Sequence, residues 1–213
     1  MRVERIATAA VRELLTRGNA GLLRTPAVGI VGSRKASIKG VDAAQDCAWQ
    51  LAKLGVTVVS GYANGIDLAS HKAALDAGGA TILVLAEGIE RFRVKQEIRS
   101  AWDWERVLVV SEYPPDAAWT AKQAFQRNGT ICDLSRAVIV AEAQRISGTM
   151  NTVRQCLKKE IPLFVVAYDN MEDLAGGNAL AIELGGRPIY KGRISQRAKI
   201  DPILELLEAR VGA

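Results

Sequence analysis

Histidine, paired cysteine and aromatic residues are scarce in this sequence of 213 residues, and their scarcity excludes several classes of protein. With one histidine, His71, and no H-E-x-x-H pattern, the sequence lacks the motifs of the common zinc hydrolases. Cys47, Cys132 and Cys156 form no C-x-x-C pair, so neither a disulfide framework nor a metal site is predicted. No G-x-S-x-G motif marks a serine hydrolase. Free cysteines are typical of a reducing compartment, so we expect a cytoplasmic protein.

Long hydrophobic runs are also absent. No apolar run approaches the roughly 18 residues that a membrane span needs. The start, MRVERIATAAVRELLTRG, alternates charges with alanines, unlike a signal peptide. We therefore expect no membrane partner. Lys and Arg outnumber Asp and Glu by 28 to 23, which leaves a net charge of +5 and favours a polyanionic partner only weakly.

Hydrophobic residues make up 49% of the chain, enough to bury a substantial core, and no linker or repeat divides it. We predict a single domain over residues 1–213, with a core at 19–190. A C-terminal helix is expected within 191–213 and an N-terminal helix within 1–18. The apolar face that predicts the N-terminal helix consists of Ile6, Ala9, Ala10, Val11 and Leu14.

Short apolar runs alternate with segments of helical length. The runs are 27–31, 56–60, 81–85, 107–111, 137–141 and 162–167, and the segments are 37–54, 66–77, 91–101, 119–134 and 149–159. Strands that are apolar along their whole length are buried on both faces, as in parallel sheets. The sequence therefore predicts an α/β fold, a doubly wound, mainly parallel, Rossmann-like sheet with helices on both faces.

The strand-to-helix turns are the expected functional surface, because ligands of such sheets bind beyond the carboxyl ends of the strands, near helix N-termini. The first turn combines a glycine, a hydroxyl and two cations in Gly32, Ser33, Arg34 and Lys35, which favours a phosphate group. It is not G-x-G-x-x-G, and no acid ends the second strand, so NAD is disfavoured. A Gly-Ser pair also occurs for turn chemistry alone.

The second turn is rich in glycine and ends at a helix-start acid. Asp67 and His71 are four residues apart and would share a helix face, so Asp67 could orient the imidazole. The alternative is a capping Asp67 beside a surface or packed His71. The candidates in this turn are Ser60, Gly61, Asn64, Gly65, Asp67 and His71.

Two later segments add hydrogen-bond donors. Arg127 and Asn128 bring a guanidinium and an amide that suit a phosphate or a base. The turn after the run 137–141 has a Ser-Gly-Thr sequence that is equally an N-cap. Its candidates are Ser147, Gly148, Thr149 and Thr152.

Together and in this order, the turns resemble the DprA/Smf (DNA processing protein A) family. The motifs are GIVGSRKAS, SGYANGIDLASHKAAL, VVSEYPP, RNGTICDLS and VIVAEAQRISGTMNT. The resemblance implies a Rossmann-like domain that binds single-stranded DNA, usually as a homodimer, and supports transformation and recombination by loading a RecA-type recombinase. It implies that the candidates of all these turns line one groove.

Asn64 and Gly129 depart from the family pattern, which commonly has arginine at both places. Two phosphate contacts would be missing, although Arg91, Arg93 and Lys95 bring other cations to the chain. The leading hypothesis is a single-stranded DNA-binding protein without enzymatic activity or a cofactor. The alternative is a sensor of a nucleotide or a nucleotide-derived ligand.

A third hypothesis, a nucleotide phosphoribohydrolase, ranks last. Related enzymes have a glutamate three residues after their Gly-Thr pair. Here Met150, Asn151 and Thr152 follow Thr149, so the carboxylate is absent.

Overall fold

The computed structural model describes residues 3–6, 13–169 and 175–209, which contain a nine-stranded sheet between two layers of helices. The strands are β1 Glu4–Ile6, β2 Leu14–Gly18, β3 Ala27–Val31, β4 Thr57–Ser60, β5 Thr81–Val84, β6 Val107–Ser111, β7 Ala137–Val140, β8 Leu163–Val166 and β9 Arg187–Ile189. The helices are α1 Ile38–Lys53, α2 Ile66–Asp76, α3 Gln96–Arg99, α4 Ala121–Asp133, α5 Gly148–Lys158, α7 Gly176–Glu183 and α8 Asp201–Ala209. Short 3₁₀ turns lie at Ala20–Arg24 and Ile89–Arg91.

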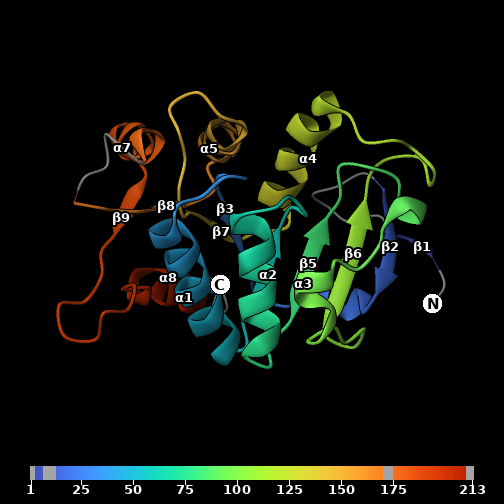
Figure 1. Ribbon diagram of the computed structural model, residues 1–213, viewed down its shortest axis with the longest axis horizontal. Coiled ribbons are helices and arrows are strands. Elements are labelled where there is room, and N and C mark those ends of the chain that lie inside the picture. Colours follow the sequence, from blue (N-terminus) through green and yellow to red (C-terminus); the bar gives the residue numbers. More distant parts are fainter. Residues whose placement is uncertain (1–2, 7–12, 170–174, 210–213) are drawn as a thin grey trace.

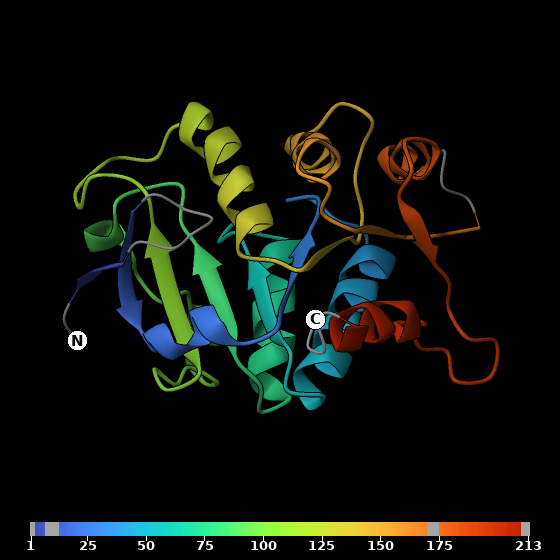
Figure 2. The same ribbon diagram turned by 180° about the vertical axis from the view of Figure 1, so that it is seen from behind.

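The strand order is β1-β2-β6-β5-β4-β3-β7-β8-β9, and the pairs from β6 to β9 are all parallel. Figure 1 shows α4, α5 and α7 along one side of the sheet and α1 and α2 along the other, and Figure 2 shows α8 beside α1. One core cluster joins α1, α2 and α8 to the sheet, and a second joins α4, α5 and α7 to it. The doubly wound α/β prediction is confirmed.

The N-terminal helix prediction is wrong for the described residues, because Glu4–Ile6 and Leu14–Gly18 are strands. β2 pairs antiparallel with β6 and so covers backbone groups that an open edge would leave unpaired. Leu14 and Leu15 enter different core clusters, as neighbours in a strand do. Ala9, Ala10 and Val11 lie outside the described residues. The apolar residues in this segment have helical spacing, but Leu14–Gly18 forms a strand because it pairs with β6, about ninety residues further along the chain.

The helix prediction over 91–101 was too long. The helix there covers Gln96–Arg99 alone, because Phe92 packs against Tyr62 and Trp102 with ring centroids 5.3 and 5.5 Å away. Tertiary contacts override local helical preference in this segment. The C-terminal helix, α8, lies within the expected range 191–213. The loop before it docks on α1, where the Ala198 N–H donates to Asp46 Oδ2 over 2.6 Å.

Candidate functional site

The sheet has its topological switch point between β3 and β7, where the chain leaves toward α1 on one face and α5 on the other. A cavity of about 470 Å³ lies at this point. Eleven predicted site residues line it: Gly32, Ser33, Arg34, Lys35, Asp67, Arg127, Asn128, Ser147, Gly148, Thr149 and Thr152. The structure thus brings together residues from three separate turns and α4.

Gly32 and Gly65 serve close packing of the protein's own backbone. A Cβ on Gly65, whose φ is 76°, would overlap the carbonyl oxygen of Ser33, and one on Gly32 would meet Ile66 and the Glu142 carbonyl. The Ser33 N–H donates to the Glu142 carbonyl over 2.8 Å. This hydrogen bond and the close packing at the two glycines therefore hold the first turn against α2 and the segment just after β7 without a ligand.

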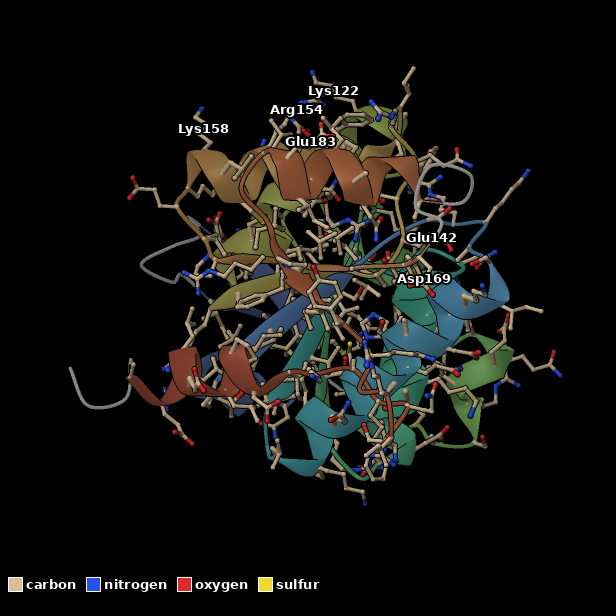
Figure 3. The ribbon with its side chains drawn as sticks, turned by 90° about the vertical axis from the view of Figure 1, so that its left-hand side faces the viewer. Lys122, Glu142, Arg154, Lys158, Asp169 and Glu183 are labelled. Carbon is tan, nitrogen blue, oxygen red and sulfur yellow. The ribbon has the colours of Figure 1, made fainter. Side chains whose placement is uncertain are left out.

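Glu142 is a buried carboxylate that sequence reasoning missed. Both its oxygens accept from the Ser37 N–H, at 3.0 and 3.2 Å, and one also accepts from the Ser37 hydroxyl. Figure 3 shows Glu142 in the interior and Glu183 on the outer surface of α7. The N-terminus of α1, where a dinucleotide pyrophosphate would bind, already holds an internal anion. An acid directly after an apolar strand at the switch point was the available sequence signal.

Replacing Glu142 with glutamine is expected to lower the free energy of unfolding by about 1–3 kcal/mol, since charge-assisted bonds at a helix N-terminus would be lost. Urea denaturation monitored by circular dichroism measures this change. Glu183→Gln, on the exposed face of α7, is the matched control and should change little. Equal stability of the two variants would contradict the capping role of Glu142.

The N-terminus of α5, in contrast, is open. Ser147 makes no side-chain cap, because its hydroxyl donates to the Gln144 carbonyl over 2.8 Å. A Cβ on Gly148 would meet nothing within 4 Å, so this end of the eleven-residue helix faces free space in the cavity. Unsatisfied N–H groups and the helix dipole make it attractive to an anion.

Arg127 is the most unusual residue of the cavity. It is only 6% exposed, and its Nη1 lies 3.8 Å from Asp67 Oδ2, an ion pair too long for a hydrogen bond. Among the described residues, its Nε and Nη1 atoms have no hydrogen-bond partner. A Cβ on Gly61 would overlap the guanidinium, so glycine is needed there. A buried cation with unmade hydrogen bonds indicates a missing anionic partner.

Asp67 is the buried charge partner of Arg127. Burial raises the pKa of the Asp67 carboxyl, and the nearby Arg127 cation and the Ala63 N–H counteract it. Burial lowers the pKa of the Arg127 guanidinium, and Asp67 counteracts that in turn, so the two charges stabilise each other in the wall of the cavity.

His71 lies beneath the cavity and lines neither it nor its neighbour. Its Nε2 is 2.5 Å from the Gly61 carbonyl oxygen and its Nδ1 is 2.7 Å from Thr81 Oγ1, so these groups and not Asp67 orient the ring. Burial lowers the pKa of His71 to about 4, so the ring is neutral and Nε2–H donates to the carbonyl. Of the alternative reading of this pair, the packed histidine is what the structure shows, whereas the capping Asp67 is wrong: α2 has no side-chain cap among the described residues, and Asp67 accepts from the Ala63 N–H over 3.3 Å.

Four other predicted residues also lie outside the lining of the first cavity. Ser60 is buried, and its hydroxyl donates to the Ile30 carbonyl over 2.6 Å. Gly61 and Gly65 make room for Arg127 and for the Ser33 backbone respectively. Asn64 lines a second cavity instead. These residues shape the turn.

The rim of the cavity carries exposed aromatic rings that sequence reasoning did not assign to the site. Trp119 is 49% exposed and Phe125 is 52% exposed, and both line the cavity. The Arg34 guanidinium carbon lies 5.5 Å from the centroid of the Trp119 ring. Exposed rings beside cations are typical of surfaces on which unpaired bases stack.

The second cavity, of about 350 Å³, adjoins the first and shares Arg34, Lys35, Trp119 and Arg127 with it. Lys95 lies near the position where Asn64 replaces the family's arginine. Its ammonium donates to Asn64 Oδ1 over 2.8 Å, so a cation from another part of the chain stands beside this turn.

An anion-receptive cavity at the switch point of a doubly wound sheet defines a Rossmann-type ligand-binding domain. The chain matches the family model of DNA recombination-mediator protein A over residues 2–194 and belongs to this family. The DNA processing protein DprA of Streptococcus pneumoniae is 34% identical over 181 residues, 84% of this chain and 64% of that protein. DprA of Bacillus subtilis is 30% identical over 179 residues, 83% of this chain and 60% of that protein.

Solved structures agree with this assignment. The X-ray structure of Streptococcus pneumoniae DprA has a TM-score of 0.77 at 31% identity and covers 88% of this chain and 70% of that one. DprA of Helicobacter pylori, studied for its single-stranded DNA binding mode, has a TM-score of 0.79 at 23% identity, over 100% of this chain and 97% of that one, and shows the shared fold. The chain spans 64% and 60% of the length of the two curated relatives named above.

No group of three or more His, Cys, Asp and Glu side chains that could hold a metal ion occurs among the described residues. No helix in the described ranges is long and apolar enough to cross a membrane.

Proposed function

We propose that this chain binds single-stranded DNA without chemical conversion, in a recombination-mediator role. The buried Arg127 guanidinium, which lines the cavity and has two nitrogen atoms without a hydrogen-bond partner among the described residues, is the observation that carries the proposal. A backbone phosphate supplies the acceptors that it lacks. The open N-terminus of α5 offers N–H donors in the same cavity.

We infer that the bound DNA is single-stranded, because the aromatic rings at the edge of the first cavity favour unpaired bases. Trp119 and Phe125 are exposed at the mouth of the first cavity, where unstacked bases can cover them. Arg34 and Lys35 stand between the two cavities and line both. A chain of phosphates crossing from one cavity to the other would pass these cations.

The two alternatives have less support. A sensor that binds a dinucleotide by its pyrophosphate would use the N-terminus of α1, which Glu142 occupies. A phosphoribohydrolase would need a glutamate after Thr149, and none is present at the expected place. The RecA-type recombinase partner, the homodimer and the cytoplasmic location stay predictions.

The salt dependence of binding tests the proposal. Fluorescence anisotropy with a labelled oligothymidylate should give a log–log slope of affinity against salt of about −2 between about 50 and 200 mM, as expected for about three phosphate contacts on a single strand. A duplex of the same length is the control, and it should bind more weakly than the single strand. Salt-independent binding, or tighter binding of the duplex, would contradict the proposal.

A further inference from the structure

The second cavity differs from the first in its chemistry. Leu85 and Ala86, which are buried just after β5, give it an apolar lining, and Tyr62 adds an aromatic ring. Its polar lining on this side comes from Asn64 and Glu87. A carboxylate repels phosphate, so this side of the cavity suits the uncharged part of a nucleotide.

The amide of Asn64 is held in one orientation. The Lys95 ammonium donates to Asn64 Oδ1 over 2.8 Å and to the Tyr62 carbonyl over 2.9 Å. An ammonium group only donates, so the oxygen of the amide must face Lys95. The Nδ2 group of Asn64 therefore remains available as a hydrogen-bond donor beside the cavity.

Glu87 is fixed through its main chain while its carboxylate stays unengaged. The Ser111 hydroxyl donates to the Glu87 carbonyl over 2.7 Å, which anchors the end of β5 to β6. Within 3–6, 13–169 and 175–209, no side chain donates to the Glu87 carboxylate, and the residue is half-buried. Glu87, with two carboxylate oxygens as acceptors, thus lines the same cavity as the Asn64 amide donor.

We propose that the second cavity is a base subsite in which Glu87 and Asn64 select guanine. The proposal rests on the proposed single-stranded DNA function and adds a sequence preference to it.

The base edges explain the choice of guanine. A carboxylate pairs best with two adjacent N–H donors, and guanine alone presents a ring N–H next to an exocyclic amino group. Adenine and cytosine offer only their amino group there. Thymine is the poorest partner, because two carbonyl oxygens flank its single N–H and would face the carboxylate. The Asn64 amide can donate to the guanine carbonyl oxygen.

Oligonucleotides that differ in single bases test the subsite. Anisotropy titrations would compare an oligothymidylate with the same strand carrying spaced guanines, and with a third strand carrying inosine, which lacks the exocyclic amino group, at those places. We expect the guanine strand to bind about five- to tenfold more tightly than the thymine strand, with inosine in between. Spaced guanines avoid self-association of the probe.

Glu87→Gln should bring the guanine and thymine strands to nearly equal affinity, because the amide removes one of the two acceptor oxygens that pair with guanine and the negative charge that faces the thymine carbonyls. Glu90→Gln, an exposed neighbour that lines neither cavity, is the matched control and should keep the preference. Equal affinity of the wild type for both strands, or a preference that survives Glu87→Gln, overturns the subsite but not DNA binding. Failure of every strand to bind refutes the proposed function and the subsite together.

Discussion

Arg127→Ala is expected to weaken oligonucleotide binding by about 1.5–3 kcal/mol, the scale of a hydrogen bond to a charged group. The guanidinium lines both cavities and has two nitrogen atoms without a hydrogen-bond partner among the described residues, so its removal takes a charged donor from a bound phosphate. Anisotropy titration with a labelled oligothymidylate at fixed salt measures the loss. The salt slope should flatten by about 0.7 as one phosphate contact disappears.

A stability effect must be separated from this binding effect. Arg127→Ala leaves the buried Asp67 without its cation, and breaking such a pair costs about 3–5 kcal/mol. In the double variant Asp67→Asn with Arg127→Gln neither charge remains, so its unfolding free energy should recover. The double variant should still bind DNA poorly. Restored binding in it would show that Arg127 has only a structural role.

The stability of the protein should fall by about 3 kcal/mol as the pH drops from 6.5 to about 4, owing to His71. Burial, aided by the Arg127 and Lys95 cations, lowers its pKa from 6.5 to about 4 in the folded state. The unfolded chain therefore binds the proton first. The contribution is fully present above pH 6.5 and is lost as the pH falls toward about 4. Urea denaturation across this range measures it.

His71→Gln isolates this effect from the other titrating groups. Glutamine keeps one donor and one acceptor, so the Gly61 carbonyl and the Thr81 hydroxyl can stay bonded. Asp67, whose pKa is raised, changes stability in the opposite direction and is common to both proteins. The difference between the two pH profiles should therefore report His71 alone. Parallel profiles would disprove the assignment.

The central sheet was predictable because its signals are local. Each strand from β3 to β8 is an apolar run, such as Val107–Ser111, and each is bounded by turn residues that the sequence itself displays. The edge was not predictable. Leu14–Gly18 becomes a strand only because β6 lies open beside it, and nothing near Leu14 in the sequence reveals that partner.

Some residues of the candidate site were likewise predictable from local sequence and others were not. Turn residues such as Arg34 and Ser147 lie in the segments between an apolar run and the next helix and were found from the sequence. Glu142 was missed because its partner, Ser37, is 105 residues distant, and Phe125 because a lone aromatic in a helix usually enters the core. His71 was ambiguous until Gly61 and Thr81 proved to be its neighbours. Binding of DNA by these residues stays a prediction.

The carboxylate at the start of α1 has a consequence for competition inside a cell. Free nucleotides and dinucleotide coenzymes are far more abundant than unpaired DNA, and Rossmann domains commonly capture them at this helix end. With Glu142 seated on Ser37, that end already has its negative charge and repels a diphosphate. A domain in which Glu142 occupies the N-terminus of α1 binds free nucleotides and dinucleotides weakly there, and its neighbouring cavity stays available for single-stranded DNA.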